Sequence, residues 1–157
     1  MPVQTVDHSA LKVNQGLVIL LLLLGFILNT PWLTAAVALV MLVGTVLGKP
    51  GFLPVYAAVL KPLGVVRPSV VVDSPEPHRF AQGVGGVVTA ASAAALLLGS
   101  AVTGWVLSWL VVALAAMNLF IGFCVGCALY YWLNRLGVPG FSRQPPDGTF
   151  PGMRPRS

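Results

Sequence analysis

The chain has 157 residues, of which 57% are hydrophobic and 8% are charged, whereas soluble domains carry roughly 25% charged residues. A chain this short cannot bury so much apolar side chain in a core of its own, so lipid must be its solvent. The length leaves room for one domain and excludes a separate catalytic module. The net charge of +5 follows from membrane topology, as argued next, and requires no nucleic-acid partner.

The charged residues fall in three segments: the first 12 residues, residues 49–79, and the residues from 135 onward. Neither interval between them carries a charge. Each interval is too long for one crossing, because a helix spans the hydrocarbon with about 20 residues, and we therefore expect each to form a hairpin. Lys and Arg in short loops stay in the cytoplasm. This predicts an integral membrane protein with both termini and the central loop on the cytoplasmic side.

The first hairpin is predicted over residues 13–47, after a cytoplasmic segment of residues 1–12. Its first helix is expected over 13–28 and its second over 32–47. Asn29, Thr30 and Pro31 between them favour a helix end followed by a new helix start. A cleaved signal peptide is the alternative for the first apolar run, but a second apolar run follows without a small-residue cleavage site.

The central cytoplasmic loop is predicted over residues 48–79 and is rich in proline. Residues 52–60 are apolar but too short to span, which favours an interfacial or re-entrant helix. Val70 to Val72 is expected to be extended, since the prolines that follow disfavour helix before them.

The second hairpin is predicted over residues 80–134, ahead of a Pro- and Arg-rich cytoplasmic tail of residues 135–157. Its first helix, over 80–98, is rich in small residues. Gly86, Ala90 and Ala94 lie four apart, the spacing that lets membrane helices approach closely. The second helix is expected to run unbroken over 105–134. The predicted fold is therefore all-α: an integral membrane four-helix bundle of two hairpins, with an interfacial helix in the central loop.

The chain's two cysteines, Cys124 and Cys127, lie three residues apart. On a continuous helix they share a face about 12 Å below its cytoplasmic end. Four interpretations compete: packing as small buried side chains, dithiol redox chemistry, a persulfide for sulfur transfer, and metal binding. Haem attachment is excluded, because Ala128 stands where that motif requires histidine.

The predicted helix argues against redox chemistry, since a reactive pair usually lies at a helix amino terminus and this pair would lie near the carboxy end. Metal binding needs about four ligands. The chain could add only His8 and His78, or a second copy's cysteines. We therefore predict no metal and no cofactor.

Other polar and small residues have candidate roles. Asn118 is expected to form an interhelical hydrogen bond in preference to lining a polar path toward Cys124, and Gly122 and Gly126 form a helix-contact motif. His78, Arg79 and Gln82 stand where the central loop meets a helix and could shape a cytoplasmic entrance or docking surface. Arg79 is also explained as an anchor to lipid headgroups.

Two segments resemble a bacterial integral membrane family catalogued as domain of unknown function 4395. They are the stretch around Arg79-Phe80-Ala81-Gln82-Gly83 and the stretch from Asn118 through Phe123-Cys124-Val125-Gly126-Cys127 to Tyr130. The resemblance runs from about Asp7 to Arg135. Glu76 and His78 stand where many members have arginine or proline.

The resemblance implies a role in thiol redox or sulfur transfer, because members tend to be encoded near thioredoxin-like proteins and sulfurtransferases. On this hypothesis Cys124 and Cys127 are the reactive pair, and a thioredoxin-like or sulfurtransferase protein docks on the cytoplasmic side. Two alternatives remain at this point. One is a non-catalytic accessory subunit of a larger membrane complex with packing cysteines. The other is a small transporter of a sulfur-containing anion, although its spans would lack the charged residue that ion pathways usually carry.

Overall fold

The computed structural model describes residues 4–155, which form mostly helix. The elements in chain order are β1 Thr5–Asp7, α1 His8–Ile27, α2 Pro31–Leu47, α3 Leu53–Val55, the π-helical η1 Tyr56–Leu60, β2 Val70–Val72, α4 Pro75–Leu97, α5 Ala101–Ala116, the π-helical η2 Met117–Ile121 and α6 Val125–Arg135.

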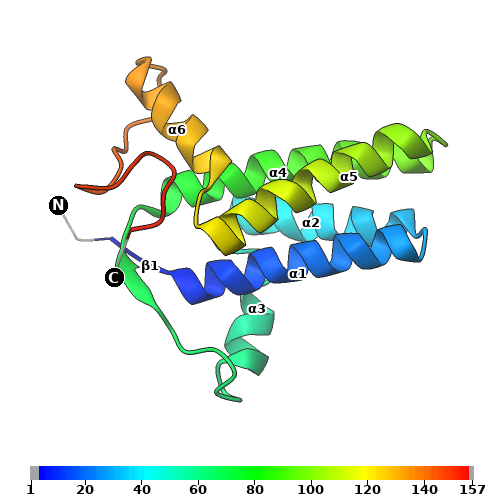
Figure 1. Cartoon of the computed structure of the whole chain (residues 1–157), viewed down its shortest axis with the longest axis horizontal. Coiled ribbons are helices and arrows are strands. Elements are labelled where there is room, and N and C mark those ends of the chain that lie inside the picture. Colours follow the sequence, from blue (N-terminus) through cyan, green and yellow to red (C-terminus); the bar gives the residue numbers. More distant parts are fainter. Residues whose placement is uncertain (1–3, 156–157) are drawn as a thin grey trace.

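Four helices, α1, α2, α4 and α5 with its extension η2, lie side by side along the long axis of the molecule (Figure 1). Three of them are long and apolar enough to cross a membrane: His8–Ile27, Pro75–Leu97 and Ala101–Ile121. The fourth, Pro31–Leu47, is apolar but has only 17 residues. The prediction of a helical membrane protein is confirmed to this extent.

Two tight turns join the helices at one end of the bundle, and the termini, the ribbon of β1 and β2, and α6 lie at the other (Figure 1). The first turn works as its sequence predicts. Asn29 adopts a left-handed conformation (φ 49°), and Pro31 opens α2, where its missing N–H costs no hydrogen bond. The two turns carry no Lys or Arg. We call the opposite end of the bundle, with the β1–β2 ribbon and α6, the polar end.

The core lies between α1, α2 and α5. Its buried members are Val18, Leu22, Val37, Met41, Val111 and Val112. The outward faces carry large apolar side chains as well: Leu20 is 51% exposed and Leu39 63%. A soluble protein does not show such a continuous apolar coat, so the outward faces suit contact with lipid.

Helices α1 and α4 each begin five residues before the predicted starts at Val13 and Phe80. The additional residues include the charged side chains of Lys12, Glu76 and Arg79, so they lie outside the uncharged intervals from which the spans were predicted. Asp7 caps α1 by accepting a hydrogen bond from the Ser9 backbone N–H at 3.0 Å. Pro75 occupies the first turn of α4.

The predicted unbroken helix over 105–134 is wrong. The chain leaves the helix at Gly122, whose left-handed conformation (φ 78°) ends η2, and a separate helix, α6, starts after Cys124. In Figure 1, α6 leans away from the four-helix array instead of continuing α5. The predicted helix of 30 residues would be about 45 Å long, well beyond the roughly 30 Å of hydrocarbon. The break therefore ends the span at the membrane's thickness.

The central loop contains the predicted helical segment, as α3 and η1, and the predicted extended segment, as β2. The sequence did not predict that β2 would pair with β1, antiparallel, with Val6 opposite Val71. The position of the carboxy-terminal tail, after α6, was not predicted either. It folds back along the cysteine segment, where Phe123 and Met153 form an isolated bridge. Parts of the predicted terminal segments, residues 1–3 and 156–157, lie outside the described residues.

The small-residue face of α4 lies against α2 at Gly86 but not at the next two residues of the predicted spacing. A Cβ at Gly86 would lie 2.9 Å from Leu42 Cδ2 on α2, so the helices approach closely there. Thr89 and Ala93 are buried on the same side, whereas the predicted Ala94 is exposed and Ala90 is only half-buried. Four residues advance about 40° past a full turn, so a strict spacing of four drifts off the contact face.

Candidate functional site

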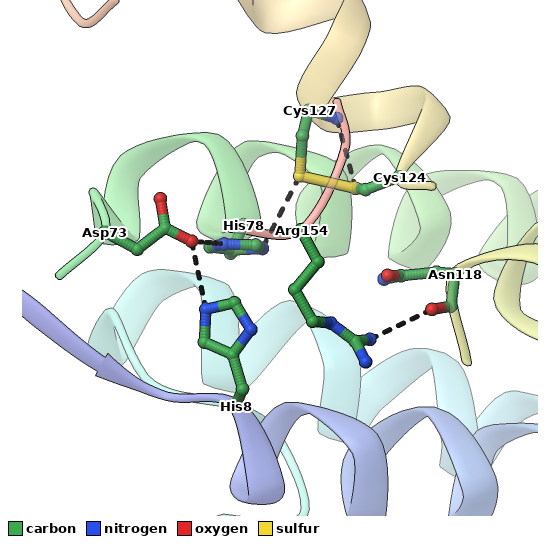
Figure 2. The surroundings of a disulfide bond; sticks show 7 residues. All are labelled: His8, Asp73, His78, Asn118, Cys124, Cys127 and Arg154. Atoms are coloured by element: carbon green, nitrogen blue, oxygen red, sulfur yellow. Dashed lines mark hydrogen bonds and ion pairs between the residues drawn. A yellow bond between two sulfur atoms is a disulfide. The ribbon is translucent and has the colours of Figure 1, made fainter. Parts of the chain in front are cut away.

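Cys124 and Cys127 form a disulfide at the amino terminus of α6 (Figure 2). Cys124 is the N-cap residue, and its Sγ accepts a hydrogen bond from the Cys127 backbone N–H at 3.2 Å. This corrects the prediction that placed the pair near the carboxy end of a long helix. At an amino terminus the free N–H groups and the helix dipole favour a thiolate, so the electrostatic argument against redox chemistry is reversed.

Two glycines set this position, in different ways. Gly122 turns the chain out of η2, so it is a helix terminator and not the predicted helix contact. Gly126 is the predicted contact: a Cβ there would lie 2.5 Å from Ala81 Cβ on α4. Without a side chain at Gly126, α6 packs its first turn directly against α4, and the disulfide faces the start of that helix.

His78, in the first turn of α4, lies against the disulfide. Its Nδ1 is 3.5 Å from Cys127 Sγ, and its Nε2 is 2.8 Å from Asp73 Oδ2. The carboxylate favours the tautomer with the proton on Nε2. The Nδ1 lone pair then faces the sulfur. Once the disulfide is reduced, His78 can accept the proton of the Cys127 thiol, the arrangement of a nucleophile, a base and a group that orients the base.

Asp73 holds this arrangement from a buried position, with 6% exposure. Its Oδ2 also accepts a hydrogen bond from His8 Nε2 at 3.1 Å, and its Oδ1 accepts one from the Ser74 backbone N–H. Burial by itself would raise the pKa of Asp73, but the hydrogen bonds from His78 and His8 outweigh it and hold the pKa well below its ordinary value. Asp73 is therefore a carboxylate at any physiological pH.

The tail closes the other side of the pair. The Gly152 carbonyl accepts a hydrogen bond from the Cys124 N–H at 2.8 Å, and the Arg154 N–H donates to the Gly122 carbonyl at 2.9 Å. The Arg154 guanidinium donates to the backbone carbonyl of Asn118 at 2.9 Å (Figure 2). Burial lowers the pKa of Arg154. Asn118 thus contacts the tail through its backbone, in place of the predicted interhelical bond.

The disulfide is buried, with Cys124 7% and Cys127 3% exposed, but it borders two hollows. A small polar hollow beside it is lined by Asp73, His78, Asn118, Tyr131 and Arg154. Cys124 and Asn118 also line a second, mostly apolar cleft between the helices. The pair therefore faces a polar and an apolar environment at once.

The predicted entrance residues lie around one surface hollow, together with Asp7 and Lys49, but they differ in what they contact. Arg79 donates to the carbonyls of Thr45 and Val46 at the end of α2. Of the three, His78 also lines the polar hollow beside the cysteines.

Gln82 bonds to backbone at two separate places. It donates to the Met41 carbonyl at 3.1 Å and accepts from the Gly51 N–H at 3.2 Å. Its Oε1 also accepts from Asn14 Nδ2 at 3.4 Å. Gln82 therefore ties α4 to α2, to α1 and to the turn that follows α2.

Two clusters have the chemistry of metal ligands. One is His78 with the two cysteines, and the other is His8, Asp73 and His78; within each, the ligand atoms lie within 4.8 Å of one another. A disulfide offers no thiolate ligands. Reduced, the first cluster would offer one nitrogen and two sulfurs, one ligand short of a structural zinc site.

Comparison with known proteins places the chain in a family. The model of a domain of unknown function, DUF4395, matches residues 6–135. The chain belongs to the DUF4395 family. The matched range starts in β1 and ends with α6, so the DUF4395 domain includes the cysteines, His8, Asp73 and His78, whereas the covering tail lies beyond it. No curated protein and no solved structure matches the chain.

Proposed function

We propose that the protein is a membrane thiol–disulfide oxidoreductase in which Cys124 and Cys127 cycle between dithiol and disulfide. One observation carries the proposal: the pair caps the amino terminus of α6 while a buried His78–Asp73 pair faces the second sulfur. A purely structural disulfide needs neither feature. Reactive dithiols use both, since each favours a thiolate.

The exchange follows from these positions. A thiolate of a partner dithiol attacks Cys124 Sγ, the S–S bond breaks, and Cys127 leaves as a thiolate. His78 Nδ1 takes up the proton that the partner's second thiol releases, and the resulting imidazolium stabilises the Cys127 thiolate. The partner's second thiolate then attacks the mixed disulfide and releases Cys124 as a thiolate, which the α6 amino terminus stabilises. The partner leaves as a disulfide, and its two electrons stay on the two sulfurs of this chain.

The polar end of the bundle is the side from which we expect the partner. Lys49, Arg79 and His78 line the surface hollow there, and basic loops remain in the cytoplasm. We therefore propose four spans in the bacterial inner membrane, with α2 as a short fourth crossing and both termini cytoplasmic. The proposed partner is a thioredoxin-like protein. A sulfurtransferase partner would instead leave a persulfide on Cys124, one sulfur atom heavier.

A second candidate function rests on the burial of the pair. The tail covers Cys124, and both cysteines are less than one-tenth exposed. That arrangement also suits a structural disulfide in an accessory subunit of a larger membrane complex.

The test is disulfide transfer between defined partners. The purified protein in its disulfide form is mixed with a reduced thioredoxin, and both are followed by alkylation and mass spectrometry. We expect transfer of the disulfide to thioredoxin. We also expect a trapped mixed disulfide when a thioredoxin lacking its second active-site cysteine reacts with Cys127→Ser protein whose Cys124 carries a small disulfide-linked thiol, since neither chain then holds a second thiol to resolve the bond. A pair that thioredoxin reduces only after the protein is unfolded would refute the oxidoreductase proposal and support the accessory one.

A further inference from the structure

A redox pair that accepts electrons must also pass them on, and the apolar cleft behind Cys124 is placed to do this. The cleft lies between α1, α4, α5 and α6, and its volume is about 140 Å³. An apolar cavity of roughly 150 Å³ accepts one benzene ring. The volume of the cleft is therefore close to that needed for one unsubstituted six-membered ring, and the substituents of a larger ring would extend toward its mouth.

The walls of the cleft suit a lipid-soluble ligand. Val84, Leu114 and Leu129 form its mouth and are 40%, 38% and 45% exposed on the outward apolar face. Its floor is buried core, including Val18 and Met41. Within the described chain its lining contains no Asp, Glu, Lys, Arg or His, and its polar side chains include the neutral amides of Asn14, Gln15, Gln82 and Asn118. A charged ligand is thus disfavoured, whereas a neutral ring with polar substituents and a hydrocarbon tail can enter from the bilayer.

The cleft shares two lining residues with the polar hollow beside the disulfide. Cys124 and Asn118 line the cleft, and the same two residues line the polar hollow that contains His78 and Asp73. A ring in the cleft therefore meets the cysteine pair from the lipid side while the proton-accepting histidine meets it from the polar side. The Asn118 amide is a neutral donor suited to a carbonyl oxygen.

We infer that this cleft binds a membrane quinone, which reoxidises the dithiol; the inference rests on the proposed function. The two S–H bonds break and the S–S bond forms. The two electrons pass to the quinone ring, and the two protons end on its two oxygens, one of them relayed by His78. The products are the disulfide seen in the structure and a hydroquinone that returns to the bilayer. Atoms and electrons balance without a further co-reactant.

Two acceptors separate this inference from the proposed function. The reduced protein in lipid nanodiscs, without oxygen, receives either a fully substituted decyl benzoquinone, which cannot form thiol adducts, or oxidised glutathione. Quinone loss is read by absorbance and the cysteines by alkylation and mass spectrometry. A chain with both cysteines replaced by serine gives the blank.

Cleft-filling variants have matched controls one position or one turn away. Val88→Phe and Leu114→Trp fill the cleft from different helices, while Val87→Phe and Leu110→Trp place the same side chains outside it. We expect each filler to slow oxidation by quinone about tenfold or more, because overpacking excludes the ring. Oxidation by glutathione and both controls should stay at the wild-type rate.

The outcomes are distinct. A wild-type dithiol that glutathione oxidises but the quinone does not would overturn the quinone site and leave the oxidoreductase standing. Fillers that behave like their controls would overturn it too. A pair that neither acceptor oxidises would overturn both proposals.

Discussion

Replacing His78 by glutamine should slow the reaction of Cys127 with an alkylating agent. Glutamine keeps a polar side chain of similar length but cannot accept the thiol proton. The Cys124→Ser background isolates Cys127, whose Sγ lies 3.5 Å from His78 Nδ1. The thiolate is the reactive form, so losing its imidazolium partner should move the pH midpoint of alkylation upward.

The size of the effect follows from the distance. A charge pair at 3.5 Å interacts by about 5 kcal/mol at an effective dielectric constant of about 20, before desolvation is subtracted. An opposite charge within this range typically shifts a titration by about 1–3 pH units. The more basic thiolate that remains is also the better nucleophile, with a Brønsted slope of about 0.5. Together these predict that, at a pH below both midpoints, the rate falls about 3- to 30-fold.

The assay is the rate of iodoacetamide alkylation across pH 5–10, read by mass spectrometry on folded protein in detergent. Arg79→Gln is the matched control, because it removes a neighbouring cation that contacts backbone carbonyls and not the sulfur. An unchanged midpoint in His78→Gln, or an equal shift in Arg79→Gln, would refute a specific role for His78.

Three further changes test the surroundings of the pair. Gly126→Ala should lower the free energy of unfolding by about 1–3 kcal/mol, because the added Cβ would clash with Ala81. Gly16→Ala is the control, since a Cβ at Gly16 would have no other atom within 4 Å, and thermal unfolding of this variant should show no loss of stability. Folding lowers the pKa of Asp73 below its ordinary value of 3.8, so the contribution of Asp73 to stability is complete above about pH 4 and is lost in stronger acid. The difference in melting temperature between the wild type and Asp73→Asn should therefore be constant from pH 7 to 5 and should narrow below about pH 4. Removing residues 149–157 should speed reduction of the disulfide by a water-soluble phosphine, since the Gly152 carbonyl then no longer covers Cys124; an unchanged rate would contradict a covering role for the tail.

Much of the helical array could be predicted from the sequence because hydropathy and charge act over whole segments. The absence of charge over residues 13–48 and 80–134, with Asn29–Pro31 as a turn signal, was enough to place both hairpin turns. The family was also predicted correctly, from the segments around Arg79 and Cys124.

The site could not be predicted, because it depends on one local break and on contacts between distant segments. Gly122 reads like any small residue in an apolar run, and only the excess length of the expected helix hinted at its role. That break alone moves Cys124 from a helix interior to an N-cap. Asp73 contacts His8, which lies 65 positions away in the sequence, and His78, which lies 5 positions away. Neither spacing matches the period of a helix or a strand, so no sequence pattern predicts these contacts.

The central claim is that Cys124 and Cys127 are a working redox pair, and a redox titration tests it most directly. Isolated membranes are equilibrated with glutathione buffers of graded potential, and the pair is read by differential alkylation and mass spectrometry. The account predicts a single two-electron transition between disulfide and dithiol, within the range of thioredoxin-like proteins, about −270 to −120 mV. A disulfide that stays intact in every buffer until the protein unfolds would contradict it.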